Sequence, residues 1–196
     1  MKRTLLTMMV TVFLLSSHML KAQEVSKEIQ IAGALMAAPE ALREGAAVLG
    51  YDKKGKLKEI KKGTNNMICV ADDPSKEGFN AAAYHKDLEP FMARGRELRA
   101  EGKSNEEVFK IREEEVKSGK LKIPNNTTLH ILSGKDAYYD EEKKEVVNGS
   151  YRWVVYIPYA TAESTGLPLA APGPGAPWLM DPGTHRAHIM ITPPRN

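Results

Sequence analysis

The segment YRWVVYI, residues 151–157, is the strongest β-strand pattern in this chain of 196 residues. Its β-branched and aromatic side chains suit the pleated, half-buried surface of a sheet. Pro158 ends the strand, because proline has no amide hydrogen to donate to a neighbouring strand. The preceding Asn148-Gly149 pair is typical of a two-residue hairpin turn. We therefore predict that Val146-Val147 lies on the strand paired with this segment.

Weaker patterns on both sides predict further strands and helices. Ser26 and the Ser104–Glu107 capping box each begin a predicted helix, and Asp87 begins a third that runs through Arg99. The residues between Asp72 and Asp87 form a predicted loop, in which Asp72-Asp73-Pro74 is typical of a turn. The predicted strands cover residues 46–51, 56–61, 67–71, 127–132 and 187–192, and the first three are expected to form an antiparallel meander.

Strands and helices are segregated along the sequence and do not alternate, which favours the α+β class. We predict a single domain in which several helices lie on one side of an antiparallel sheet. The helix that begins at Ser104 has a thin apolar stripe of Val108, Ile111 and Val116. Its acidic run Glu113–Glu115 is therefore interpreted as a solvated helix face.

The N-terminus has the pattern of an export signal. Lys2 and Arg3 precede an apolar run at residues 5–15, and Ala22 provides a small residue for cleavage. The run is shorter than the roughly 20 residues needed to span a bilayer. We predict a signal peptide at 1–22, a globular domain at 23–196, and a periplasmic or secreted location with no integral membrane segment after cleavage.

Charge and motifs exclude several classes of function. The chain has 28 Lys and Arg and 25 Asp and Glu residues, and Lys2, Arg3 and Lys21 lie in the predicted signal peptide. The remaining chain is balanced in charge, so we expect no nucleic-acid partner. It contains no phosphate-binding loop, no dinucleotide fingerprint and no Cys-x-x-Cys pair, and we expect no organic cofactor.

The densest group of chemically versatile side chains lies at residues 173–193, GPGAPWLMDPGTHRAHIMITP. Residues 159–183 form a long segment rich in Pro, Gly and Ala, and loops of this length are often functional. We interpret PWLM, residues 177–180, as a lid docked on the domain with His188 beneath or beside it. The predicted ligand-contacting residues are His188, Trp178, Met180 and Thr184.

The same region offers an alternative, in which zinc is held by His188, His185, His130 and Asp181. His185 and His188 are three residues apart and would lie on opposite faces of a continuous strand, so a shared ion requires a turn between them. A copper ion could instead use His188 and Met190, which share a strand face, together with Met180. The opposing interpretation is a core histidine bonded to a backbone carbonyl.

Two blocks resemble a family of uncharacterised exported bacterial proteins. The first is Ala37-Ala-Pro-Glu-Ala41, followed by a predicted strand pair and Gly63-Thr-Asn-Asn-Met-Ile-Cys69-Val-Ala-Asp-Asp-Pro74. The second is Pro177-Trp-Leu-Met180, followed by Pro182-Gly-Thr184 and Ala187-His-Ile-Met190. The resemblance spans residues 32 to 193 and implies no established activity. It implies that relatives carry a second cysteine within the segment here reading Asn80–His85, so a disulfide they form is absent here. It also favours His188 over His185.

These observations lead us to expect an exported bacterial protein that is a non-catalytic binding or accessory protein of the cell envelope. The alternative is a zinc- or copper-dependent enzyme or metal-binding protein centred on His188. A third hypothesis is a structural envelope protein that acts through protein partners. Cys69 is the only cysteine, and its place in the apolar run Met67–Val70 favours a buried, inert thiol.

Overall fold

A computed structural model describes residues 25–194 of the protein. The predicted signal peptide, residues 1–22, lies outside the described residues. The helices and strands are α1 (Lys27–Met36), α2 (Glu40–Arg43), β1 (Ala47–Tyr51), β2 (Leu57–Lys61), β3 (Met67–Val70), β4 (Phe79–His85), the 3₁₀ turn η1 (Lys86–Leu88), α3 (Glu89–Ala100), α4 (Asn105–Lys117), β5 (Thr127–Gly134), β6 (Tyr138–Asp140), β7 (Glu145–Val147), β8 (Ser150–Tyr156), α5 (Ala162–Thr165), β9 (Trp178–Met180) and β10 (His188–Ile191).

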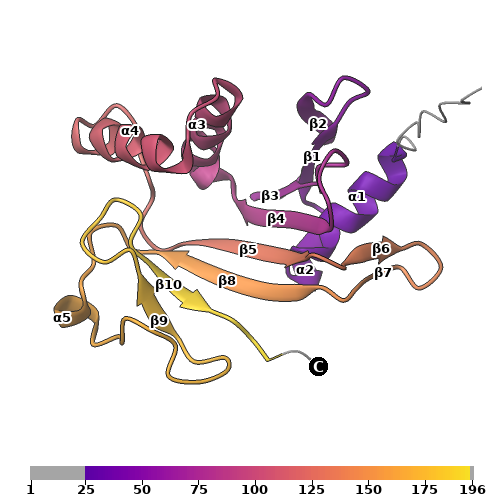
Figure 1. Ribbon diagram of the computed structural model, residues 1–196. Coiled ribbons are helices and arrows are strands. Elements are labelled where there is room, and N and C mark those ends of the chain that lie inside the picture. Colours follow the sequence, from indigo (N-terminus) through magenta and orange to yellow (C-terminus); the bar gives the residue numbers. More distant parts are fainter. Residues whose placement is uncertain (1–24, 195–196) are drawn as a thin grey trace, which may run out of the picture.

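Within residues 25–194, eight strands form one sheet in the order β2-β1-β3-β4-β5-β8-β10-β9, as Figure 1 shows. The predicted α+β class is confirmed. The predicted antiparallel meander at 46–71 is wrong, because β1 and β3 are parallel. The turn after β2 carries the chain back across the start of β1, where the amides of Thr64 and Asn65 donate to the Gly45 carbonyl at 2.7 and 3.0 Å. β3 therefore runs in the same direction as β1.

The central strand β4 occupies a segment that the sequence predicts to be a loop. Alanine has a weak preference for strands, and Ala81, Ala82 and Ala83 fill the middle of β4. The strand nevertheless pairs with β3 on one side and β5 on the other. Ala81 and Ala83 are fully buried, so these small side chains leave space for a covering helix to approach.

The predicted hairpin at Asn148-Gly149 is also wrong in its pairing. In the described part of the chain, β7 pairs with β6 in a separate two-stranded sheet, while β8 pairs with β5 and β10. Asn148 has a φ of 57°, the turn conformation its sequence suggests. Its carbonyl lies against Gly134, where a Cβ would approach it to 2.7 Å. This corner redirects the chain into the main sheet, so the turn exists but joins two different sheets.

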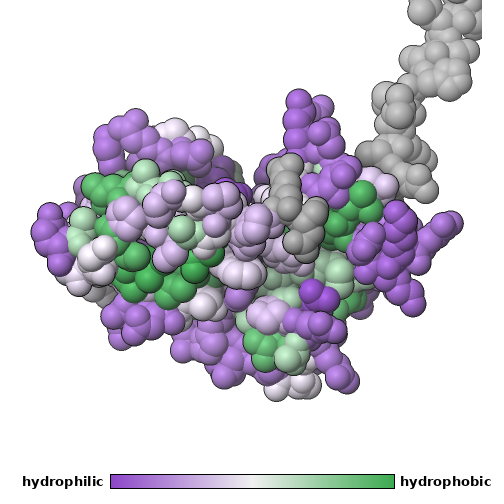
Figure 2. Space-filling model, turned by 90° about the horizontal axis from the view of Figure 1, so that it is seen from below, coloured by the Kyte–Doolittle hydropathy of each residue, from purple (hydrophilic) through white to green (hydrophobic). Residues whose placement is uncertain are grey.

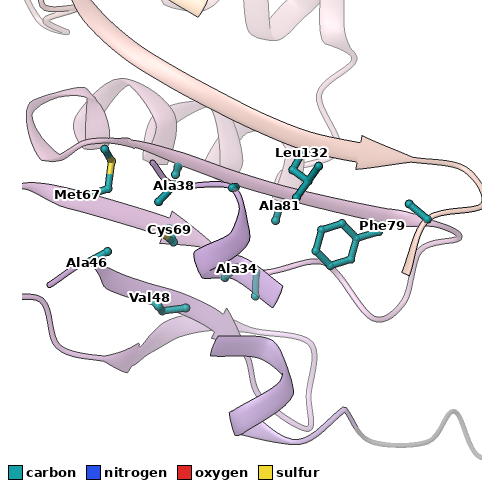
Figure 3. Close-up of a cluster of buried hydrophobic side chains, with 13 residues drawn as sticks. Ala34, Ala38, Ala46, Val48, Met67, Cys69, Phe79, Ala81 and Leu132 are labelled. Atoms are coloured by element: carbon teal, nitrogen blue, oxygen red, sulfur yellow. The ribbon is translucent and has the colours of Figure 1, made fainter. Parts of the chain in front are cut away.

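Helices cover both faces of the sheet, which corrects the prediction that they lie on one side. Helix α1 packs on one face against residues such as Val48, Cys69 and Leu132, and Figure 3 shows this cluster. Helices α3 and α4 cover the other face. The residues buried there are Tyr84, Leu88, Phe91, Leu121, Leu129, Val154, Tyr156 and Met190. Below we call these the α1 face and the α3–α4 face.

Figure 2 views the molecule from below, where hydrophobic patches are separated by hydrophilic residues. Trp153 of β8 is 42% exposed and Leu169 of the following loop is 56% exposed. Among the described residues, no helix is both long enough and apolar enough to cross a membrane.

Candidate functional site

Three of the four predicted ligand-contacting residues lie together on the α3–α4 face. His188 pairs across the sheet with Met180, and Met190 pairs with Trp178. The predicted lid is thus the edge strand β9, joined to β10 by backbone hydrogen bonds. Its side chains Trp178 and Met180 pack against the core on the α3–α4 face. Thr184 has a different role, because its hydroxyl donates to the Asp181 carbonyl at 2.8 Å and closes the turn before β10.

His188 is a buried residue with a backbone partner. It is 6% exposed, its Nδ1 lies 2.7 Å from the Arg186 carbonyl oxygen, and its ring centroid lies 5.7 Å from that of Tyr156. Burial lowers the pKa of His188 below its ordinary value, although the Arg186 carbonyl opposes that shift. This arrangement matches the core histidine that the sequence offers as the alternative to a ligand.

His185 is fully buried and contacts helix α4. Its backbone amide donates to Glu113 Oε2 at 2.9 Å, and its Nδ1 contacts the same carboxylate oxygen. The ring packs edge-on against Phe91 and Phe109, and Nε2 has no hydrogen-bond partner. The interpretation of Glu113–Glu115 as a solvated helix face is therefore wrong, since Glu113 anchors the loop and Glu115 is buried beside Arg94.

The predicted metal ligands are not brought to one point. His130 neighbours Ala83 and Trp153 in the sheet and lies on the α1 face, whereas His188 lies on the α3–α4 face. Asp181 is paired with Arg186 Nε at 2.7 Å. Within residues 25–194, no group of three or more His, Cys, Asp and Glu residues could hold a metal ion. The zinc or copper alternative stays a prediction that elemental analysis of untagged protein would test.

The sequence predictions did not include a buried arginine that packs against Phe91. Arg112 of α4 is only 6% exposed, and its guanidinium carbon lies 4.0 Å above the ring of Phe91. Nη1 donates to the Phe91 carbonyl at 3.2 Å, and Nε has no partner. Among the described residues, no carboxylate forms an ion pair with it. Burial lowers the pKa of Arg112 to about 10, so it remains charged at neutral pH.

Two further guanidinium groups lie near Arg112. A Cβ at Gly95 would be 3.0 Å from Arg112 Nη1 and 3.4 Å from Arg99 Nη2, so both groups lie over this glycine. Arg186 is the third, with its carbon 5.1 Å from the Phe109 ring centre. Burial lowers the pKa of Arg99, and the charges of Arg96 and Arg186 lower it further. We call Arg99, Arg112 and Arg186 the arginine cluster.

A pocket of about 260 Å³ adjoins the arginine cluster, and we call it the polar pocket. Arg99 belongs to both features. Asp72 and Asp73 face α3 across this pocket, so the sequence interpretation of Asp72-Asp73-Pro74 as an ordinary turn is incomplete. The lining residues are Tyr51, Val70, Ala71, Asp72, Asp73, Lys76, Glu77, Asn80, Ala82, Tyr84, Met92, Arg96 and Arg99.

One sequence signal could have identified Arg112. It lies four residues after Val108 and four before Val116, so it shares the helix face of these two apolar residues. A charged residue inside an apolar stripe is unusual, because charges are rarely buried without a partner. Arg99 gives no comparable signal, since it lies among other exposed charges on α3.

No family model, curated protein or solved structure matches this chain.

Proposed function

We propose that this is an exported, non-catalytic binding protein whose ligand carries an oxyanion held by Arg99 and Arg112. The observation that carries the proposal is the burial of Arg112 without an ion pair among the described residues, beside the guanidinium of Arg99. A carboxylate, phosphate or sulfate group would be the complementary ligand, because arginine donates to planar or tetrahedral oxyanions through two nitrogens at once.

The energetics of the unliganded cluster support this proposal. A buried charge loses its hydration, and in folded proteins it is normally compensated by an opposite charge. Arg112 donates to the Phe91 carbonyl and lies over the Phe91 ring, and Glu115 attracts its charge without forming an ion pair. Arg99 adds a like charge nearby. An anion between the two groups would remove their repulsion and supply the missing hydrogen-bond acceptors.

The proposal also explains the polar contacts around the cluster. Arg186 is already paired with Asp181, which holds it in the turn before β10. The contact between His185 and Glu113 ties the same turn to α4. The turn that carries Arg186 and the helix that carries Arg112 are thus joined by fixed contacts, which hold these two members of the cluster in position.

The test is calorimetric titration of the mature protein with phosphate, sulfate and succinate at low ionic strength. The variants are R112M and R99M, each of which removes one charge and keeps an unbranched side chain. R152M is the matched control, because Arg152 is exposed on β8 outside the cluster. We expect saturable binding that weakens at least about tenfold in R112M and R99M, as for a lost charged hydrogen bond. R152M should bind like the wild type.

The proposal would be wrong if none of the three anions gave saturable binding, or if R112M bound all of them unchanged. The proposed export has its own test. Expression of residues 1–196 in a bacterial host, followed by mass spectrometry of the extracytoplasmic fraction, should recover a chain that begins at Gln23. Recovery of only the full-length chain from the cytoplasm would contradict export.

A further inference from the structure

Most charges around the polar pocket are already paired within the protein. Arg96 donates to Glu89 at 2.5 Å and to the Tyr84 hydroxyl at 3.1 Å, and that hydroxyl donates to Glu89 at 2.6 Å. Asp73 pairs with Lys76 at 3.1 Å on the rim. These groups shape the pocket wall, but their charges are balanced locally and give a ligand little net attraction.

Three charged lining groups form no ion pair among the described residues, and they are Asp72, Arg99 and the solvent-exposed Glu77. Asp72 accepts hydrogen bonds from backbone amides, among them that of Asn80 at 2.8 Å, and forms no ion pair. Arg99 on α3 likewise forms no ion pair. Asp72 extends from the segment after β3 and Arg99 from the helix above the sheet. The pocket therefore offers an unpaired anion on one wall and an unpaired cation on the other.

We infer that the polar pocket binds a small zwitterionic compound, with its oxyanion at Arg99 and its ammonium group at Asp72. This inference rests on the proposed oxyanion site and adds the second half of the ligand. Tyr51 lines the same pocket, within electrostatic reach of Asp72, Asp73 and Arg96. Its hydroxyl makes no hydrogen bond to another described residue, so it can serve the ligand.

The size of the pocket limits the ligand to a small molecule. Its volume of about 260 Å³ is below the roughly 300–1,000 Å³ of pockets that enclose drug-sized ligands. A compound of amino-acid size fits this description. O-Phosphoethanolamine and L-glutamate are suitable probes, and ethyl phosphate and glutarate are their counterparts without the ammonium group.

The inference predicts a dependence on pH. Burial raises the pKa of Asp72 to about 6, and the neighbouring Asp73 charge adds to this shift, while hydrogen bonding by the Asn80 amide opposes it. The other charged or titratable groups around the pocket are Lys76, Glu77, Tyr51, Arg96 and Arg99. Glu89 acts on the pocket indirectly, because it is paired with Arg96. Since Asp72 is ionised only above about pH 6, the ammonium group should be attracted at pH 7.5 and much less at pH 5.

The experiment is calorimetric titration of the mature protein with each probe and its counterpart at pH 7.5 and pH 5. We expect wild type to bind phosphoethanolamine about tenfold more tightly than ethyl phosphate at pH 7.5, as a charged pair in a partly desolvated site implies. The preference should shrink to near unity at pH 5 and in D72N. D140N is the matched control, because Asp140 at the end of β6 also accepts backbone amides but does not line the polar pocket.

The possible outcomes separate the inference from the proposed function. If wild type binds the amine probes and their counterparts equally, and R99M weakens both, the zwitterion is excluded while the oxyanion site stands. If no probe binds, the oxyanion site itself is wrong. If D72N does not fold, the pH dependence of the wild-type preference decides, and a preference that is constant from pH 5 to 7.5 overturns the role of Asp72.

Discussion

The two faces of the sheet bury very different side chains. The cluster on the α1 face consists of alanines with Val48, Met67, Cys69, Phe79 and Leu132, all without a charge. The α3–α4 face buries Arg112, Glu115, His185 and His188 beside its aromatic residues. Apolar burial stabilises a protein directly, whereas buried ionisable groups cost free energy unless they are paired. The first face is therefore stabilised by apolar burial alone, whereas the second combines apolar burial with ionisable groups that need compensation.

The largest effect should come from the α1 face. Leu132 is 2% exposed, and truncation of a buried leucine typically costs about 2–5 kcal/mol because it leaves a cavity. Urea denaturation of L132A should show a loss of unfolding free energy of this size, with oxyanion affinity unchanged. The control L169A, at a leucine that is 56% exposed, should stay within about 0.5 kcal/mol of wild type. Equal losses in both variants would contradict the assignment of this core.

The next effect concerns the contact between Glu113 and His185 on the opposite face. Burial alone would raise the pKa of Glu113, but Lys117 and the amide and ring of His185 outweigh it and lower this pKa to about 2. Because the folded pKa lies below the usual 4.5, this stabilisation is present above about pH 5 and is lost as the pH falls toward 2.

We expect E113Q to reduce the unfolding free energy by roughly 1–2 kcal/mol at pH 7, after allowance for solvent screening. Near pH 2 the variant and the wild type should converge. Chemical denaturation at pH 7, 4 and 2 measures the difference. The control E114Q changes the adjacent, less constrained carboxylate and should have little effect at any pH. A difference for E113Q that does not change with pH would rule out the charge of Glu113 as the cause.

The third prediction is a gain in unfolding free energy, whereas the first two are losses. Replacement of a buried charge by an apolar side chain of similar length is often neutral or stabilising. In the absence of ligand, R112M should therefore gain about 1 kcal/mol, even though it loses the hydrogen bond to Phe91. The same variant should lose the extra stability that phosphate gives the wild type. Thermal unfolding with and without phosphate measures both the stability of R112M and its response to the anion. A loss of several kcal/mol without phosphate would mean that Arg112 stabilises the fold.

A smaller effect is expected at Asp72. Its folded pKa of about 6 lies above the usual 3.8. The folded state therefore favours protonated Asp72, and this contribution to the unfolding free energy is complete below about pH 4 and is lost as the pH rises through 6. D72N should therefore be more stable than wild type at pH 7, by less than about 1 kcal/mol for this half-buried group, and equal to it at pH 4. Denaturation curves at the two pH values would reveal the difference. Equal stability at both would mean that ionised Asp72 bears no cost.

The smallest expected effect is an absence of reaction at Cys69. Burial raises the pKa of this thiol to about 12, and only the thiolate is a strong nucleophile. Folded protein should not react with a thiol reagent at pH 8 over an hour, whereas protein in urea should react stoichiometrically. Rapid labelling of the folded form would show that the α1 face opens.

Local signals in the sequence predicted much of the fold. The capping box at Ser104 and the strand at residues 151–157 are both present. Sequence reasoning failed where tertiary packing decides the outcome. The segment 79–85, predicted to be a loop, is the central strand β4 because it pairs with β3 and β5 on its two sides. Its alanines also leave room for the helix that covers the sheet.

The candidate site was predicted only in part. The pairing of β9 with β10 brought Trp178, Met180 and His188 together as expected from their separate blocks. Arg112 was missed because its signal, a charge within the apolar stripe of Val108 and Val116, was not used, and Arg99 was missed because it is exposed among other charges on α3. Their proximity depends on Gly95, which lets two helices place guanidinium groups over the same point.

The position of β10 has a consequence for the order in which the molecule can be assembled. It follows every other strand in sequence, yet it lies between β8 and β9. During synthesis from the N-terminus, β9 emerges before β10, the strand that joins it to the rest of the sheet. The edge strand β9 can therefore join the main sheet only after β10 has paired with β8.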